Sequence, residues 1–80
     1  MEPKIIRRLG LTPRERGSLS NGTCPDIFEL DNGDFAVIGT DATESLEQHL
    51  PPDAGRADYE RIVVVSRATL LAAKTDIPER

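Results

Sequence analysis

The pair Asn32-Gly33 constrains the fold more than any other feature of this chain. It divides two apolar-rich runs in the stretch CPDIFELDNGDFAVIGTD, residues 24–41. Asn-Gly is the preferred pair for a tight hairpin turn, because both central residues of a type I′ turn need positive φ. The stretch therefore predicts a β-hairpin over residues about 26–39.

The hydrophobic pattern predicts the register of this hairpin. A two-residue loop sets Leu30 opposite Phe35 and Phe28 opposite Val37, so that all four side chains share one face. A three-residue loop would instead set Phe35 opposite Glu29, which separates apolar from polar side chains less well. Register follows the pattern that gives one clean apolar face, so we predict the two-residue loop.

Three further elements follow the hairpin. Asp41 can cap a helix over residues about 42–50, which two prolines then end. The run RIVVV, residues 61–65, is apolar and β-branched after its first residue, which predicts a third strand that is covered on both faces. Ser66 can cap a terminal helix over residues about 67–74.

These elements predict an α+β fold with a small three-stranded, mainly antiparallel sheet and two short helices. The third strand can lie beside the first strand of the hairpin or beside the second, and the sequence leaves this choice open. The chain of 80 residues is expected to form one small domain, with a loop-rich basic segment at residues 1–23. Within that segment, TPRE at residues 12–15 has the form of a single-turn helix start.

The composition allows only a small core. Leu, Ile, Val and Phe make up a quarter of the residues, and there is no Trp. At this size stability is marginal and oligomerisation is a common remedy. The single cysteine excludes an intramolecular disulfide, and no run is long and apolar enough for a signal peptide or a transmembrane helix. We therefore expect a cytoplasmic protein that does not bind membranes.

The net charge of −4 hides an uneven distribution. Residues 1–17 carry five basic and two acidic side chains, and the acidic residues outnumber the basic ones in the rest of the chain. An acidic body repels polyanions, so any contact with nucleic acid would fall to the basic side chains of the head, Lys4, Arg7, Arg8, Arg14 and Arg16. If helical, the segment KIIRRL would be amphipathic. It could contact a phosphate backbone, contact a protein partner, or pack on the domain's own acidic sheet, which is the interpretation that we favour.

No constellation of residues points to catalysis. Cys24 and His49 are the only soft metal ligands, whereas zinc sites require four ligands. An EF-hand loop with Gly33 at its sixth position would put Phe28 at the first, where an oxygen ligand belongs. The sequence lacks a nucleophile elbow, a dinucleotide-binding fingerprint and a phosphate-binding loop. We therefore expect neither an enzyme nor a cofactor, and we expect Cys24 to be chemically quiet.

The run from CPDIFELDNGDFAVIGTD to ERIVVVSRATLLAAKTDIP, together with the head RRLGLTPRERG, resembles a set of small proteins from Streptomyces-type actinobacteria. No reaction is assigned to those proteins, so the resemblance implies no catalytic residues. More distantly, the order of cysteine, acidic hairpin, apolar strand and terminal helix is similar to the BldB-like proteins. Those proteins accompany helix-turn-helix regulators.

Together these features predict a non-enzymatic protein–protein interaction module, an accessory to a helix-turn-helix transcriptional regulator. The alternative is a nucleic-acid-binding accessory that uses the basic head, and a small-molecule or enzymatic role comes third. The third strand is expected to need cover that so short a chain hardly provides. We therefore also predict a homodimer in which the strand pairs with its own copy, through Ile62, Val63, Val64 and Val65.

Overall fold

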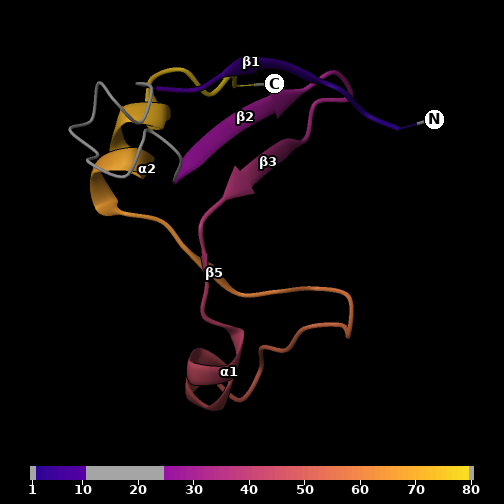
Figure 1. Cartoon of the computed structure of the whole chain (residues 1–80), viewed down its shortest axis with the longest axis vertical. Coiled ribbons are helices and arrows are strands. Elements are labelled where there is room, and N and C mark those ends of the chain that lie inside the picture. The colour runs from indigo at the N-terminus through magenta and orange to yellow at the C-terminus, as the bar shows by residue number, and fades with distance from the viewer. Residues whose placement is uncertain (1, 11–24, 80) are drawn as a thin grey trace.

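The computed structural model describes residues 2–10 and 25–79. Its elements fall into two groups (Figure 1). The body consists of strands β1 (Ile5–Arg8), β2 (Asp26–Leu30) and β3 (Phe35–Ile38) and of helix α2 (Arg67–Lys74). The arm consists of β4 (Thr40–Asp41), α1 (Thr43–Leu46), the 3₁₀ helix η1 (Glu47–His49), a loop, and β5 (Val63–Val64). The arm projects from the end of β3.

The predicted α+β class is confirmed, with one change in which strand completes the sheet. The body holds a three-stranded antiparallel sheet in the order β1-β2-β3, so the third strand comes from the N-terminal segment. The strand expected over residues 61–65 shortens to Val63–Val64 and pairs only with Thr40–Asp41 in a separate ribbon. Residues 5–8, expected to be loop or amphipathic helix, are extended.

The charges of β1 and β2 explain why the N-terminal segment occupies this place. The register sets Arg7 opposite Glu29, and the Arg7 Nε and Glu29 Oε1 atoms lie 2.7 Å apart. Arg8, the next residue of β1, forms an ion pair with Asp26 at the start of β2. Opposite charges on facing strands favour pairing, and the β-branched Ile5 suits an extended backbone. The interpretation that the basic head packs on the acidic sheet is therefore confirmed for Ile5–Arg8.

The predicted hairpin is present, but its predicted register is wrong. Phe35 faces Glu29, and the N–H of Leu30 donates to the carbonyl of Asp34 over 2.9 Å, as in the three-residue loop. The turn itself decides the register. The Gly33 N–H donates to the Leu30 carbonyl over 3.1 Å, and Gly33, with a φ of 92°, closes the three-residue loop in the left-handed region. The loss of a clean apolar face is the consequence of this local geometry.

The core of the body is small. Among the described residues, the buried hydrophobic side chains are Leu9, Ile27 and Ala73. They come from the end of β1, from β2 and from α2, so the helix covers one face of the sheet near β2. The predicted cap of α2 is confirmed, because the Ser66 Oγ atom accepts a hydrogen bond from the Thr69 N–H over 3.1 Å.

The arm has little hydrophobic packing of its own. The helix predicted over residues 42–50 forms as α1 followed by η1. Leu46, the hydrophobic residue of these two helices, is exposed. The Cα radius of gyration of the chain is 14.0 Å, against about 12 Å expected for a compact domain of this length. No helix in the described part of the chain is long and apolar enough to cross a bilayer.

Candidate interaction surface

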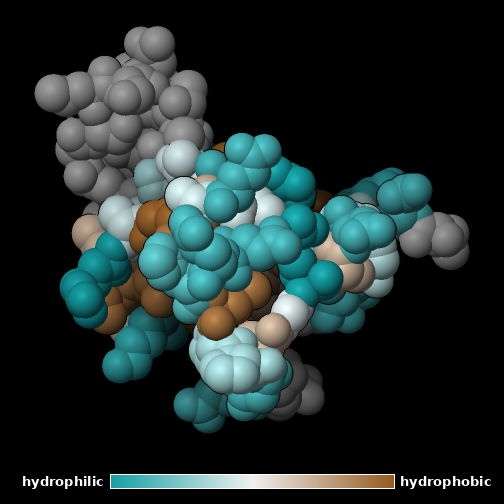
Figure 2. Space-filling model, turned by 90° about the horizontal axis from the view of Figure 1, so that it is seen from below, coloured by the Kyte–Doolittle hydropathy of each residue, from teal (hydrophilic) through white to brown (hydrophobic). Residues whose placement is uncertain are grey.

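Exposed large apolar side chains outnumber the buried ones in the described parts of the body and the arm. Only three hydrophobic side chains are buried among residues 2–10 and 25–79. The large hydrophobic residues of the same segments that remain exposed are Ile5, Ile6, Phe35, Val37, Ile38, Leu46, Tyr59, Val63, Val64, Leu70, Leu71 and Ile77. Figure 2, which views the molecule from below, shows hydrophobic side chains open to solvent beside the hydrophilic surface. So much exposed apolar area on a small protein is typical of a binding surface.

The strand β3 contributes the most regular part of this surface. It pairs with β2 along one edge, and its outer edge pairs with no other strand among the described residues. Phe35, Val37 and Ile38 are 41%, 46% and 48% exposed. The strand therefore presents an open backbone edge flanked by apolar side chains.

The predicted interface residues Ile62–Val65 lie in the arm. The carbonyl of Ile62 accepts the Ala42 N–H over 2.8 Å, and the Ile62 N–H donates to the Thr43 Oγ1 atom over 2.8 Å. Val63 and Val64 are exposed rather than covered on both faces. Part of the backbone expected to be open is thus used within the chain, and contact with another chain through these residues stays a prediction.

Two of the basic side chains predicted to contact a partner are engaged inside the body. The Arg7 guanidinium binds Glu29 and also donates from Nη2 to the Asp76 carbonyl over 2.7 Å. The Arg8 Nε atom lies 2.9 and 3.1 Å from the two carboxylate oxygens of Asp26. These carboxylates neutralise the two guanidinium groups, which makes both side chains poor anchors for a phosphate.

The remaining basic residues of the head have a different setting or are not described. The side chain of Lys4 is exposed, and its backbone N–H donates to the Asp31 Oδ1 atom over 3.1 Å. Arg14 and Arg16 lie outside the described residues, as do Cys24 and the helix start predicted at residues 12–15. Of the five predicted basic residues, the structure therefore describes Lys4, Arg7 and Arg8, and two of these three are paired with carboxylates.

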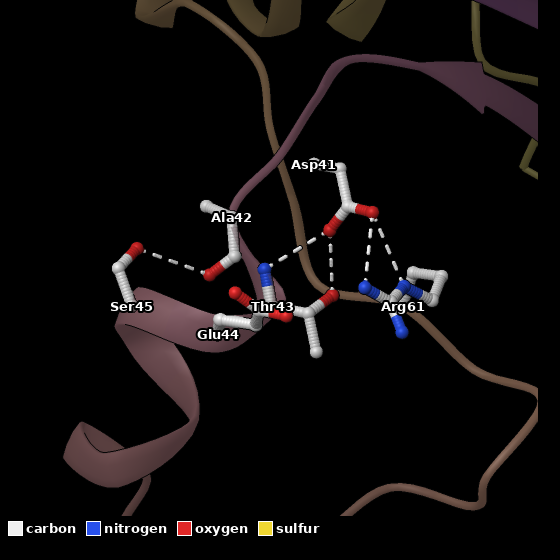
Figure 3. A pocket seen from close by; sticks show the side chains of 6 residues that line it. All are labelled: Asp41, Ala42, Thr43, Glu44, Ser45 and Arg61. Atoms are coloured by element: carbon white, nitrogen blue, oxygen red, sulfur yellow. Dashed lines mark hydrogen bonds and ion pairs between the residues drawn. The ribbon is translucent and has the colours of Figure 1, made fainter.

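The arm contains a polar pocket of about 420 Å³. Figure 3 shows that its polar groups point toward one another. The Asp41 Oδ1 atom accepts from the Thr43 N–H over 3.0 Å and from the Thr43 hydroxyl over 2.7 Å, and Oδ2 faces Arg61 at 3.2 Å. The hydrogen bonds from Thr43, assisted by Arg61, hold the pKa of Asp41 below its ordinary value. The predicted N-cap is thus displaced by one residue: the N-cap of α1 is Ala42, and Asp41 before it accepts the N–H of the first helical residue. A carboxylate held in this way is a poor general base.

The other candidate groups show turn and surface roles. His49 is exposed at the end of η1. In the acidic turn, the Asn32 Oδ1 atom accepts the Asp34 N–H over 2.9 Å, as turn chemistry requires. No group of three or more His, Cys, Asp or Glu side chains within residues 2–10 and 25–79 is arranged to hold a metal ion.

Sequence reasoning missed two features of this surface. It gave the free sheet edge to residues 61–65, because the strand order was open, whereas the structure gives one to Phe35–Ile38. It also missed the Arg8–Asp26 pair. Its signal was present in the sequence, where a basic run and an acidic run lie in segments that can pair as strands.

No family model, curated protein or solved structure matches this chain.

Proposed function

We propose that this protein is a non-enzymatic protein–protein interaction module. The observation that carries the proposal is the excess of exposed over buried apolar side chains among the described residues. Exposed apolar area costs free energy in water, and a partner surface that covers it recovers that free energy. The extended shape, with its separate arm, offers more contact area than a compact domain of the same length.

The polar groups support a binding role more than a catalytic one. The strongest polar cluster, around Asp41, has its hydrogen bonds directed inward to Thr43 and Arg61. Among the described residues, no buried side-chain nitrogen or oxygen atom lacks a hydrogen-bond partner. Polar side chains that serve capping and strand pairing leave little free chemistry for a reaction.

A DNA-binding regulator of the helix-turn-helix class is the partner that we propose. The support is the resemblance in layout to the BldB-like proteins, which accompany such regulators. A cytoplasmic location belongs to the same proposal, because the regulator acts there and a lone cysteine suits a reducing compartment. The engaged state of Arg7 and Arg8 gives the alternative, direct nucleic-acid binding, less support.

The test is a binding titration against the helix-turn-helix regulators encoded beside the gene in its native genome. We expect a complex whose affinity changes little with salt, because apolar contacts are less sensitive to ions than phosphate contacts. Binding to a generic DNA duplex, with an affinity that falls steeply with salt, would favour the nucleic-acid alternative. Absence of any complex with these regulators would overturn the proposed partner.

Matched variants on α2 locate the contact. Leu71 is 56% exposed, so Leu71→Ser removes apolar surface without opening the core. Ala68→Ser on the same helix is the control, since it changes an exposed small side chain. If α2 takes part in the contact, Leu71→Ser weakens the complex and Ala68→Ser does not.

A further inference from the structure

We propose that the outer edge of β3 pairs with the same edge of a second copy of this chain. The pairing is antiparallel about a two-fold axis, so that two three-stranded sheets form one continuous sheet. This inference rests on the proposed function, because it names one partner of the interaction module. It places self-association at Phe35–Ile38 and not at Ile62–Val65.

The two edges of the body sheet differ in how they are protected. The edge strand β1 carries the charges of Arg7 and Arg8, and its register shifts between Ile5 and Arg7. Charges and bulges are the devices by which natural sheets block edge-to-edge pairing. The strand β3 reads FAVI, has no charge and no proline, and pairs with β2 in an unbroken register. Within the described residues, charges and a register shift thus protect the β1 edge, and no such feature protects the β3 edge, called the bare edge below.

The hydrogen bonds of the hairpin show which backbone groups of β3 are free to pair. Leu30 donates to the Asp34 carbonyl, so this is a hydrogen-bonded pair of the antiparallel ladder. Such pairs alternate with pairs that exchange no hydrogen bonds, so Ala36 is the next residue that bonds to β2. Phe35 and Val37 therefore direct their N–H and C=O groups away from β2, toward the bare edge.

This alternation restricts the symmetric registers. Outward-directed residues must pair with outward-directed residues, and a two-fold axis at Ala36 sets Phe35 of each copy opposite Val37 of the other. An axis at Val37 would require pairing by Gly39, which lies outside β3. The register centred on Ala36 forms aromatic–β-branched pairs, which are favourable across strands.

Charge favours a second copy as the occupant of this edge. The residues that pair carry no charge, so self-pairing brings no like charges into opposition, and Asp34 at the end of the strand comes to face Ile38 of the other copy. Self-pairing of β1 would bring its arginines together. The ribbon strand β5 has only two residues to offer. The β3 edge is therefore the self-complementary edge of the described structure.

Side chains add apolar contact to the backbone pairing. Val37 lies opposite Ile27, whose side chain is buried in the core with Ala73 of α2, so Phe35 and Val37 project from the face of the sheet that carries α2. A two-fold axis perpendicular to the sheet keeps these side chains of both copies on the same face. They would lie beside one another between the two α2 helices and cover part of their exposed area.

Two valine variants test whether the dimer interface lies at β3 or at the ribbon of β4 and β5. Val37 and Val64 are 46% and 47% exposed, and both lie in strands. We expect analytical ultracentrifugation to show a reversible dimer of the unmodified protein at micromolar concentrations. Val37→Lys is expected to weaken it by about tenfold or more, because the change affects both cross-strand pairs, and Val64→Lys is expected to leave it intact. A dimer that Val64→Lys disrupts and Val37→Lys does not would place the interface at the ribbon and overturn the proposal.

Amide hydrogen exchange tests the same edge without any substitution. The Phe35 and Val37 amides are expected to exchange more slowly as the protein concentration rises, whereas the Ala36 amide is protected at every concentration by its bond to β2. Equal, concentration-independent exchange of the Phe35 and Val37 amides would overturn the pairing. A monomer that still binds a regulator would overturn the self-pairing alone, and a dimer that binds no regulator would overturn only the proposed partner.

Discussion

The Arg8 guanidinium of β1 forms an ion pair with the buried carboxylate of Asp26 in the neighbouring strand β2. The Nε atom lies 2.9 and 3.1 Å from the two carboxylate oxygens, and the Asp26 side chain is only 4% exposed. The same guanidinium lies over the ring of Phe28, 5.3 Å from its centroid. Arg8 therefore holds the N-terminal strand to the sheet through both an ion pair and a cation–π contact.

Arg8→Ala is expected to destabilise the protein by about 1–3 kcal/mol, because it leaves the buried carboxylate of Asp26 without its cation. The partial solvent exposure of the Arg8 side chain keeps the expected loss below that of a fully buried ion pair. Arg7→Ala is the matched control. The Arg7–Glu29 pair is more open to solvent, and such pairs contribute about 1 kcal/mol or less. Urea denaturation followed by circular dichroism measures both. Equal losses for the two variants would contradict the special role of Arg8.

The place of the basic head was predictable from charge, but its conformation was not. An acidic hairpin and a basic segment in one short chain indicate that the two pack together, as Arg7 and Arg8 do with β2. The spacing of Lys4, Arg7 and Arg8 also suits one face of a helix. Pairing with an existing strand edge overrides this local pattern, because it satisfies backbone hydrogen bonds together with the charges.

Gly33→Val is expected to destabilise the protein by more than about 1 kcal/mol, because a β-branched residue fits positive φ poorly. Gly33 has a φ of 92°, and nothing lies within 4 Å of the place that a Cβ atom would occupy, so the whole effect comes from the backbone. Gly55→Val is the control, since its site is equally open and its φ lies outside the left-handed region. Melting temperatures followed by circular dichroism compare the two, and a Gly33→Val protein as stable as the control would contradict the turn.

The hairpin also shows where hydrophobic pattern stops being a guide to register. Both loop lengths place Asn32-Gly33 in the turn, and the pattern favours the register that puts Phe35 opposite Leu30. The structure puts Phe35 opposite Glu29 instead. A pattern argument assumes that one face is buried against a core, but α2 covers only part of the sheet and Phe35 stays exposed. The free edge of β3 could not be predicted from the sequence either, because strand order depends on contacts between segments that lie far apart in the chain.

The pKa of Asp41 provides a test of the arm. This pKa is lowered from the ordinary value of 3.8, chiefly by the hydrogen bonds from Thr43 and less by Arg61. A lowered folded-state pKa stabilises the fold at pH above the unfolded value, and this contribution disappears as the pH falls through the folded value. We expect the Thr43 amide to stay protected from exchange at the ordinary pKa of 3.8 and to lose protection only at lower pH, as Asp41 becomes protonated.

Two variants check the cause of this shift. Thr43→Val removes the hydroxyl that bonds to Asp41, so the Asp41 pKa is expected to rise toward its ordinary value. Arg61→Ala removes a hydrogen bond and a charge that also lower the pKa, so it is expected to raise the pKa as well. Titration of the Asp41 carboxyl carbon by NMR measures both changes. An Asp41 pKa that stays unchanged in the Thr43→Val protein would contradict the role of the hydroxyl.

Gly39 joins the body to the arm, and its lack of a side chain lets the chain pass close to β5. A Cβ atom at Gly39 would lie 2.5 Å from the Val64 carbonyl oxygen and 3.0 Å from the Val65 Cγ1 atom. Gly39→Ala is therefore expected to force the two strands apart and to cost about 1–3 kcal/mol locally. Hydrogen exchange should show faster exchange at the Ala42 and Ile62 amides, which bond within the arm, while the Leu9 amide, which bonds to Ile27 in the body, stays protected. Uniform loss of protection in both parts would mean that the arm and the body unfold as one unit.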